Sequence, residues 1–275
     1  MRLCASAVSS NNFKTYFKKL KINYGVRLLI LLSGGIILLF VIAPVAGMFI
    51  SAEGITDTIK DKEVIDSIRL TLCTSFVATL IFGILSVPLA YFLARRNFYL
   101  KPLVLAVIDL PIVIPHSAAG IALLGFINRD SLVGKAASYA GIDFVSNPAG
   151  VIVAMAFVSL PFFINSARDG FANVPVRFEK VAASMGAGPL KIFFTISLPL
   201  AYRSILSGAV MMFARGMSEF GAVVIIAYHP MIAPVMIWDR FTAYGMKYAQ
   251  PVAVVFLFVT LIVFTVLRYI SKKPK

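Results

Sequence analysis

The chain has 275 residues, of which 60% are hydrophobic and 14% are charged, which excludes an ordinary soluble domain and indicates a polytopic membrane protein. Its net charge of +14 would suit a nucleic-acid partner, but the basic residues fall between hydrophobic runs and mark membrane topology instead. Two cysteines and two histidines are too few for a disulfide framework or a metal cluster, and no G-x-x-x-x-G-K-[ST] phosphate loop occurs.

Residues 1–27 predict a basic N-terminal tail in the cytoplasm. The hydrophobic run that begins at Leu28 is too long for the core of a signal peptide, so we interpret it as an uncleaved first span. Each crossing needs about 20 apolar residues. On this basis, residues 28–270 predict an all-α bundle of six transmembrane helices, and 271–275 a short cytoplasmic tail. The predicted spans are 28–50, 68–94, 103–127, 149–167, 204–228 and 250–269.

The basic residues predict the side of the membrane on which each loop lies. With the N-terminus in the cytoplasm, eighteen of the 26 Lys and Arg residues fall in inside segments and seven in outside segments, which leaves Arg215 within a span. Such an excess is typical of cytoplasmic loops. We therefore expect a multi-pass protein of the cell membrane with both termini in the cytoplasm and surplus cations facing lipid headgroups.

Two predicted outside loops have distinct compositions. The first is acidic, and is either a solvated surface or a rim on which an external binding protein docks. The last, Tyr228–Gln250, is rich in aromatic residues, which suits anchoring at the headgroup level or a short helix that a partner could grip. The acids of the first loop are Glu53, Asp57, Asp61, Glu63 and Asp66.

The most informative stretch lies between the fourth and fifth spans, from Asn173 to Pro199. Asn173 suits the cap at the start of a helix, and Pro175 suits the first turn, where the backbone N–H that proline lacks would have no helical partner. Gly186 predicts the end of that helix, and Gly188 begins a second short helix that must end or kink before Pro199. Apolar residues at i, i+4, i+7 and i+11 predict one apolar stripe. The stripe consists of Val174, Phe178, Val181 and Met185.

This stretch resembles the cytoplasmic loop of ABC-importer permease subunits, in which a helix rich in acid and alanine is followed by a glycine, nine residues and I-x-L-P. Gly186 and the segment 196–199 match that spacing, but the acid, Glu179, lies one residue before the triplet position at 180–182. The resemblance implies that the loop 173–199 docks on a separate ATPase subunit; the alternative is an ordinary amphipathic connector. The implied docking residues are Phe178, Glu179, Val181, Ala182, Met185, Gly186, Ala187 and Gly188.

A break is predicted in the third span. The segment 109–120 resembles the L-P-x-x-x-P-x-x-x-x-G signature of permeases for molybdate, tungstate and sulfate. Its two prolines leave backbone groups without their helical hydrogen bonds, and these groups must bond to protein or to water in a cavity. The region is therefore a candidate gate. In the alternative, residues 101–115 form a short interfacial helix. Asp109 must face protein or the interface, and His116 is either a satisfied core histidine or a substrate contact. The gate candidates here are Pro111, Pro115, His116 and Ser117.

The fifth predicted span carries two charges, Arg215 and Glu219, which are four residues apart and can pair on one helical face. Each charge near the bilayer centre costs about 2.5–3.5 kcal/mol on insertion scales, so both should face the bundle interior. They form either an ion pair that holds helices together or part of a pathway wall on which Arg215 attracts an anion. Ser218 completes these pathway candidates, and Gly216 and Gly221 allow close helix approach or a hinge.

Over roughly residues 28–270 the chain resembles archaeal-type molybdate/tungstate permease subunits, with further matches at 225–230, 238–241 and 247–251. The resemblance implies a type I ABC importer permease that moves tungstate or molybdate by alternating access. Its implied partners are two separate ATPase subunits, a second copy of the chain, an external oxyanion-binding protein and the lipid bilayer, but no nucleic acid. The chain itself is expected to have no catalytic, cofactor or metal site, since ATP and Mg²⁺ are used by the ATPase.

Three alternatives remain. The nearest is a permease for sulfate or another small anion. An ion-coupled secondary transporter predicts an internal repeat with paired broken helices and midplane carboxylates, of which one broken segment and one acid, Glu219, are evident. An intramembrane enzyme needs a catalytic or metal constellation that the sequence lacks.

Overall fold

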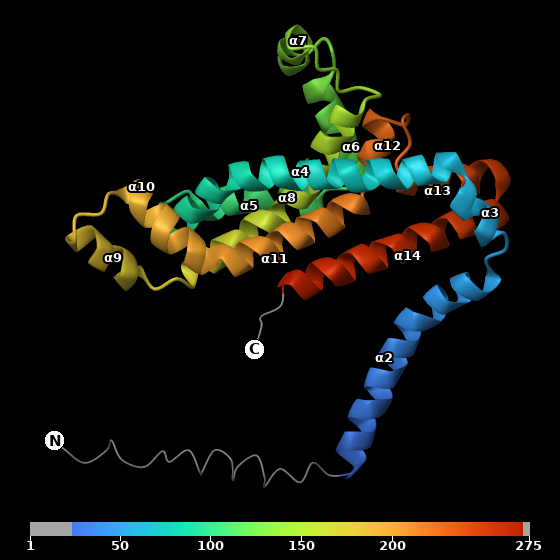
Figure 1. The fold of residues 1–275 in the computed structure, drawn as a ribbon, viewed down its shortest axis with the longest axis horizontal. Coiled ribbons are helices and arrows are strands. Elements are labelled where there is room, and N and C mark those ends of the chain that lie inside the picture. The colour runs from blue at the N-terminus through green and yellow to red at the C-terminus, as the bar shows by residue number, and fades with distance from the viewer. Residues whose placement is uncertain (1–23, 272–275) are drawn as a thin grey trace. The chain divides into compact units, whose positions relative to one another are not determined.

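The computed structural model describes residues 24–271, and the side chains of residues 28–269. Every regular element in this range is helical, which confirms the predicted all-α class. The elements are α2 (Tyr24–Ser51), α3 (Ile55–Lys60), α4 (Lys62–Arg95), α5 (Lys101–Val113), α6 (His116–Ile127), α7 (Leu132–Tyr139), α8 (Pro148–Ala172), α9 (Val176–Ser184), α10 (Pro189–Ile192), the π-helix η1 (Phe193–Ser197), α11 (Leu198–Met217), α12 (Val223–Ile226), α13 (Ala233–Tyr244) and α14 (Met246–Ser271) (Figure 1).

The described range contains five helices that are long and apolar enough to cross a membrane. A sixth crossing is formed if the bent pair α5 and α6 counts as one span. The chain is therefore a multi-pass membrane protein, in agreement with the six predicted spans. Residues 1–23 and 272–275, which make up most of the two predicted tails, lie outside the described range.

Helix α2 belongs to a separate unit, residues 1–51, and is described by itself. It has 28 residues and contains Pro44. At about 1.5 Å per residue it is longer than the ~30 Å hydrocarbon core of a bilayer. Its large apolar side chains between Leu28 and Phe49 are exposed in this unit. A helix that is apolar all round is suited to lipid or to the surface of other membrane helices.

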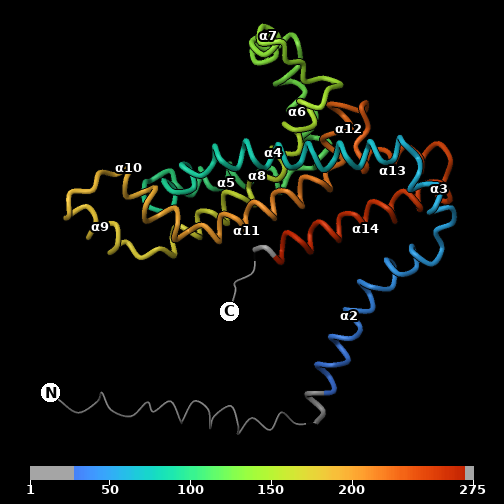
Figure 2. The backbone as a smooth tube through the Cα atoms, in the orientation of Figure 1, coloured from blue at the N-terminus to red at the C-terminus, as the bar shows by residue number. Residues whose placement is uncertain are grey.

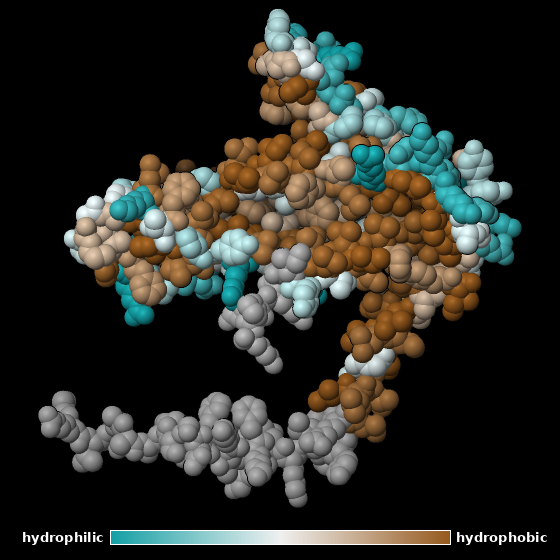
Figure 3. Space-filling view, viewed as in Figure 1, coloured by the Kyte–Doolittle hydropathy of each residue, from teal (hydrophilic) through white to brown (hydrophobic). Residues whose placement is uncertain are grey.

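The second unit, residues 52–275, is built on α4, α8 and α11, which lie side by side (Figures 1 and 2). Their shared core contains the fully buried side chains of Ala90, Met155 and Met212. Close approach depends on small residues, because a β-carbon on Gly208 of α11 would lie only 2.9 Å from the β-carbon of Ser166 on α8. Small residues at such crossings are typical of membrane helices. Figure 3 shows hydrophobic residues over the middle of this unit and hydrophilic ones toward its ends.

One end of the second unit is formed by α3, α13 and the first turns of α4 and α14 (Figure 1). The aromatic segment 228–250 contains helix α13, in agreement with the short helix that was one of its two predicted alternatives, and the acidic segment 53–66 folds into α3 and the start of α4. Three acids of the acidic segment pair with cations of the aromatic segment, among them Glu63, which lies 3.9 Å from Arg240. Arg240 donates to Asp61 at 2.6 Å, and Lys247 lies 3.2 Å from Glu53. The hydrogen bond from Arg240 holds the pKa of Asp61 below its usual value.

Two span boundaries differ from those predicted. The second span begins at Lys62 rather than 68, because the Asp61 side chain accepts the Glu63 N–H and caps the helix there. The fifth was predicted at 204–228, whereas the helical path runs from Pro189 to Met217. Its early start depends on a π-turn, η1, which carries the helix past the proline that was expected to end or kink it.

The predicted break in the third span is present. Helices α5 and α6 are bent by 112° between Val113 and His116. Pro115 is the N-cap of α6, and Pro111 lies buried within α5. At the break the Ile114 N–H donates to the Leu110 carbonyl at 3.1 Å, and the Ala119 N–H donates to the Pro115 carbonyl at 3.0 Å. The bend points α6 away from the direction of α5 (Figure 1).

Candidate functional site

Helix α9 ends in the way its glycine predicts. Gly186 has φ +84°, in the left-handed region that favours glycine. The N–H groups of Ala187 and Gly186 donate to the carbonyls of Ala182 and Ala183, each at 3.0 Å, which is the Schellman arrangement. The start of the helix was predicted wrongly. Pro175, not Asn173, is the N-cap, and Asn173 instead ends α8.

One face of α9 presents apolar side chains to the outside. Phe178, Val181 and Met185 of the predicted stripe are exposed, Met185 at 76%, whereas Val174 is buried beneath the helix. Leu190 of α10 is exposed beside the turn. The Arg177 guanidinium lies over the Phe178 ring at 5.2 Å from its centroid. Of the other predicted docking residues, Gly186 and Gly188 are exposed in the turn and Ala187 is half-buried.

The opposite face of α9 turns toward the bundle. Glu179 Oε1 accepts hydrogen bonds from Arg95 Nε at 2.9 Å, Arg95 Nη2 at 2.7 Å and the Ser197 hydroxyl at 2.7 Å. Arg95 Nη2 also donates to the Val174 carbonyl at 3.1 Å, and the Tyr91 hydroxyl lies 3.5 Å from the carboxylate. We call these five residues the Glu179 node. Glu179 and Ala182 were also predicted as docking residues; Glu179 contacts the chain's own bundle, and Ala182 is buried.

A second polar group forms where α6 begins and α11 ends. Arg215 Nη2 lies 3.0 Å from Glu219 Oε2 and 2.9 Å from His116 Nε2, and His116 Nδ1 lies 3.3 Å from the same carboxylate oxygen. Arg215 Nη1 donates to the Ser218 hydroxyl at 3.3 Å. We call these four residues the Arg215 cluster. The predicted pair of Arg215 and Glu219 is confirmed, and His116 joins it from 99 residues away in sequence.

The Arg215 cluster is unevenly exposed. Glu219 is only 1% exposed, and its Oε1 accepts the Ala222 N–H at 3.0 Å. Both carboxylate oxygens therefore have polar partners. The Arg215 side chain is 24% exposed and that of His116 is 42% exposed. Ser218 is exposed next to them. A guanidinium with an open edge, beside hydroxyl donors, is the kind of group that binds an oxyanion.

Tight backbone packing fixes the Arg215 cluster in place. A β-carbon on Gly221 would lie 2.6 Å from the β-carbon of His116, and one on Gly216 would lie 2.7 Å from the Ser75 hydroxyl. That hydroxyl donates to the Phe213 carbonyl at 2.7 Å and ties α4 to the end of α11. Only glycine fits these two positions without displacement, which agrees with the close approach that the sequence predicted.

The remaining pathway candidates surround the α5–α6 break. Ser117 is exposed on the first turn of α6 beside His116, Pro115 is exposed and Pro111 is buried. Asp109 accepts a hydrogen bond from the Asn165 amide of α8 at 2.6 Å. The acid therefore faces protein, which is one of the two positions expected of it. The structure thus brings His116, Arg215, Ser218 and Glu219 together and leaves the prolines to shape the bend.

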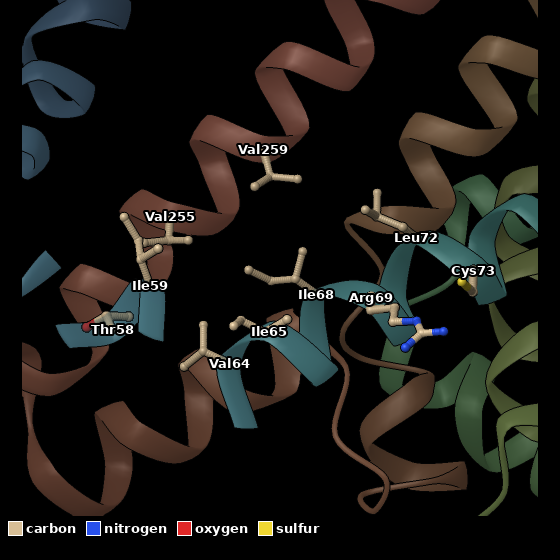
Figure 4. A pocket seen from close by; sticks show the side chains of 10 residues that line it. All are labelled: Thr58, Ile59, Val64, Ile65, Ile68, Arg69, Leu72, Cys73, Val255 and Val259. Atoms are coloured by element: carbon tan, nitrogen blue, oxygen red, sulfur yellow. The ribbon is translucent and has the colours of Figure 1, made fainter. Parts of the chain in front are cut away.

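A groove of about 370 Å³ lies away from both polar groups, between α3, α4 and α14 (Figure 4). Arg69 is the one charged residue in its lining, and its walls are otherwise almost entirely apolar. Such a surface suits lipid chains or an apolar helix rather than a hydrated anion. We therefore do not place the pathway there. Its lining residues are Thr58, Ile59, Val64, Ile65, Ile68, Arg69, Leu72, Cys73, Val255 and Val259.

Several residues of the two polar groups were missed by the sequence reasoning. Arg95 lies 84 residues from Glu179, and Ser197 lies in a segment in which only the I-x-L-P spacing drew notice. Tyr91 and Ser75 lie in an apolar span that contains several other hydroxyl side chains. No local spacing links them to their partners. The available signal was indirect, because an acid displaced by one residue from the family pattern must face a different direction.

Comparison with known proteins identifies the family. Residues 86–275 match the family described as binding-protein-dependent transport system inner membrane component. Over 246 residues the chain is 42% identical to the molybdate/tungstate transport system permease protein WtpB of Pyrococcus abyssi, a match that covers 88% of this chain and 94% of the relative. The corresponding protein of Methanocaldococcus jannaschii is 40% identical over 236 residues, with 86% and 93% covered.

Solved structures give the same fold. A chain of the bacterial alginate ABC transporter, crystallised in complex with alginate pentasaccharide-bound periplasmic protein, superposes with a TM-score of 0.71. The match covers 93% of this chain and 96% of that one, at 16% sequence identity, and therefore bears on the fold alone. The helical fold is that of a type I ABC importer permease, as the sequence predicted. The chain belongs to the family of binding-protein-dependent transport system inner membrane components.

Proposed function

We propose that this chain is the membrane-spanning permease subunit of an ATP-driven importer for tungstate and molybdate. The observation that carries the proposal is the combination of two features in one multi-span bundle. An exposed apolar face lies on α9 at one end, and a partly open guanidinium, Arg215, lies among the spans. The first suits a partner that supplies work, and the second suits an anionic substrate.

The partner at α9 is a separate ATPase subunit. Phe178, Val181 and Met185 form a compact apolar face that water does not favour, and Leu190 extends it across the Gly186 turn. A stable docking surface buries at least about 1,000 Å² in total. One short helix supplies part of that area, so neighbouring residues of the turn and of α10 contribute the rest. ATP and Mg²⁺ are used by the ATPase, and this chain binds neither and carries no catalytic residue.

The assembly contains two copies of this chain, two ATPase subunits and an external oxyanion-binding protein in the cell membrane. The excess of basic residues supports a cytoplasmic position for α9 and both termini. The acidic first turns of α4 and helix α13 then face the outside, where a binding protein delivers its anion. A periplasmic protein bound to the structurally related alginate transporter is consistent with this arrangement. Nucleic acid has no place in it.

The substrate passes the Arg215 cluster. Tungstate and molybdate are compact dianions with oxygen acceptors on every side. The partly exposed Arg215 guanidinium and the exposed Ser117 hydroxyl offer donors, His116 and Ser218 contact the guanidinium, and the buried Glu219 offsets its positive charge. Because Glu219 offsets part of the charge of Arg215, the guanidinium holds an anion weakly, which permits its release. The α5–α6 bend brings His116 to the cluster and is the candidate gate, with Pro111 and Pro115 at its two ends.

Two alternatives are separated from this proposal by observation. A sulfate importer would use the same geometry, because sulfate has the same shape and charge. An ion-coupled secondary transporter should have broken helices in both halves, but the described range contains one bent pair. Relatives named as molybdate/tungstate permeases are 40% and 42% identical to the chain, whereas relatives named as sulfate permeases match over a similar length at 29% and 33%, which favours molybdate and tungstate.

The test is reconstitution of this chain in liposomes with the ATPase and the oxyanion-binding protein of the same organism. We expect ATP-dependent accumulation of tungstate or molybdate that stops when the ATPase is omitted. Competition with sulfate measures the selectivity among the three anions. Transport that continues without ATP hydrolysis, or that depends on an ion gradient, would overturn the proposal.

A further inference from the structure

The Glu179 node is closed on all sides, although it begins on the helix that we assign to partner docking. The side chains of Arg95 and Glu179 are 11% and 13% exposed, and Ser197 is fully buried. Two guanidinium N–H groups and one hydroxyl converge on a single carboxylate oxygen. A charge held by this many donors in a buried place resists being pulled away.

The node joins four parts of the chain. Tyr91 and Arg95 lie in the last two turns of α4, Val174 follows α8, Glu179 belongs to α9, and Ser197 is the last residue of the π-helix η1. The Tyr91 ring stands edge-on to the rings of Phe171 and Phe193, with centroids 5.2 and 5.0 Å away, and this closes the node from the apolar side.

Little else holds α9 to the bundle. Ala182 is its one buried residue, and a methyl group contributes only a small apolar contact. The large apolar residues of α9 face outward. A force applied to the outer face of α9 therefore reaches the bundle mainly through the Glu179 carboxylate.

The π-turn provides a joint at the point where that force arrives. A π-turn is a local departure from regular helix geometry that occurs often at functional sites. Ser197 donates to Glu179 from the end of this turn, and Pro199 follows in the first turn of α11. From Ser197 to Arg215 the helix rises about 27 Å at ~1.5 Å per residue. Helix α11 thus connects the node to the Arg215 cluster.

Helix α4, which lies beside α11 (Figure 1), also connects the Glu179 node to the Arg215 cluster. Arg95 is the last residue of α4, and the Ser75 hydroxyl of the same helix donates to the Phe213 carbonyl beside the Arg215 cluster. Two long helices therefore leave the node and meet again at the Arg215 cluster. A tilt of α9 that moves Glu179 would move both helices together.

We propose that the Glu179 node is the mechanical link between the docking helix and the spans. Arg95, Glu179 and Ser197 transmit the movement of the ATPase to α4 and α11, and thereby to the Arg215 cluster. They are positioning residues, since none touches the substrate. The inference rests on the proposed function, because it assumes that α9 receives work from an ATPase. Loss of the link should uncouple hydrolysis from transport without releasing the ATPase.

The experiment uses the full assembly in liposomes and compares Glu179→Gln and Arg95→Gln with Arg96→Gln. Arg96 is the next residue along and is exposed, so it controls for loss of a basic residue at this end of the chain. Three quantities are measured, namely the ATPase retained on the purified permease, the rate of ATP hydrolysis, and the tungstate or molybdate imported per ATP.

We expect Glu179→Gln and Arg95→Gln to retain the ATPase and its hydrolysis, and to lower anion import per ATP about tenfold. Arg96→Gln should match the wild type. The exchange Arg95→Glu with Glu179→Arg should recover part of the coupling, because it restores the ion pair but not the bond from Arg95 to Val174. Unchanged import per ATP in both single variants would overturn the inference.

Two further outcomes are informative. If the charge variants do not fold, Ser197→Ala removes one donor without creating an unpaired charge; it should lower import per ATP two- to threefold, and full coupling in this variant would contradict the inference. If the single variants release the ATPase instead, Glu179 acts in docking and the proposed link is wrong. If the wild-type assembly itself neither binds an ATPase nor imports an anion, the proposed function fails before the link is tested.

Discussion

Two glutamates organise the polar chemistry of this chain, and the exposure of their partners differs. Glu179 is enclosed together with its arginine, and Arg95 Nε, Arg95 Nη2 and the Ser197 hydroxyl all donate to one of its carboxylate oxygens. Glu219 is more deeply buried, yet its partners Arg215 and His116 keep about a quarter and two fifths of their side chains exposed. The first arrangement is suited to carrying force. The second keeps donors available for an anion.

This difference follows from where the partners come from. The Glu179 carboxylate lies between the end of α4 and the π-turn, and aromatic rings close the remaining side. The Arg215 cluster lies at the bend between α5 and α6, where the chain turns away and leaves one side open. Five changes can break or sharpen the comparison, and they follow in order of expected effect.

Arg215→Gln should have the largest effect, because it removes the cation from the open cluster and leaves Glu219 buried without its arginine. Removing one partner of a buried pair costs about 3–5 kcal/mol. We expect a lower unfolding temperature in detergent and more than a hundredfold loss of anion import. Arg129→Gln is the control, since the Arg129–Asp143 pair is exposed and such a pair contributes about 0–1 kcal/mol.

The double variant Arg215→Gln with Glu219→Gln separates stability from transport. It removes both charges, so that no unpaired charge remains, and most of the unfolding temperature should return. Import should stay lost, because no cation faces the anion. Import at the wild-type rate in the double variant would show that the cluster is only a structural ion pair.

Met185→Glu tests the outward face of the docking helix α9, away from the Arg215 cluster. Met185 is 76% exposed, so folding should change by no more than about 0.5 kcal/mol. A charge placed in an apolar interface should weaken ATPase association about thirtyfold or more, which corresponds to about 2 kcal/mol. Tyr99→Glu changes an exposed apolar residue just beyond α4 and should leave association unchanged. Equal binding by both variants would place the ATPase elsewhere.

The sequence predicted what depends on local spacing. Arg215 and Glu219 pair because they are four residues apart, Gly186 ends α9 because it adopts a positive φ, and Pro111 and Pro115 bend the third span. It could not predict which distant residues complete each group. His116 reaches Arg215 across 99 residues and Arg95 reaches Glu179 across 84, and these contacts are set by helix packing rather than periodicity. The end of the fifth span was missed because the residues after Met217 are as apolar as a span.

Gly221→Ala should have an intermediate effect confined to the open cluster. The added β-carbon would lie 2.6 Å from the β-carbon of His116, so that His116 and the start of α6 must shift. We expect about a tenfold loss of anion import with ATPase association unchanged. Gly125→Ala is the matched control, since it lies in the same helix as His116 with open space around it and should stabilise that helix by up to about 1 kcal/mol. Equal import by the two variants would mean that the position of His116 does not matter.

Asp61→Asn should have the smallest effect, because the Asp61–Arg240 pair is the partly exposed counterpart of the two buried glutamates. Arg240 lowers the pKa of Asp61 in the folded protein, so the pair contributes stability at pH values above the ordinary carboxyl pKa of about 3.9 and loses it as the pH falls through the lower folded pKa. A surface pair of this kind contributes about 0–1 kcal/mol. Thermal unfolding in detergent at pH 7 should therefore show the variant slightly less stable than the wild type. The difference should shrink below about pH 4, and a difference that persisted there would mean that Asp61 acts through its helix cap on Glu63 rather than through its charge.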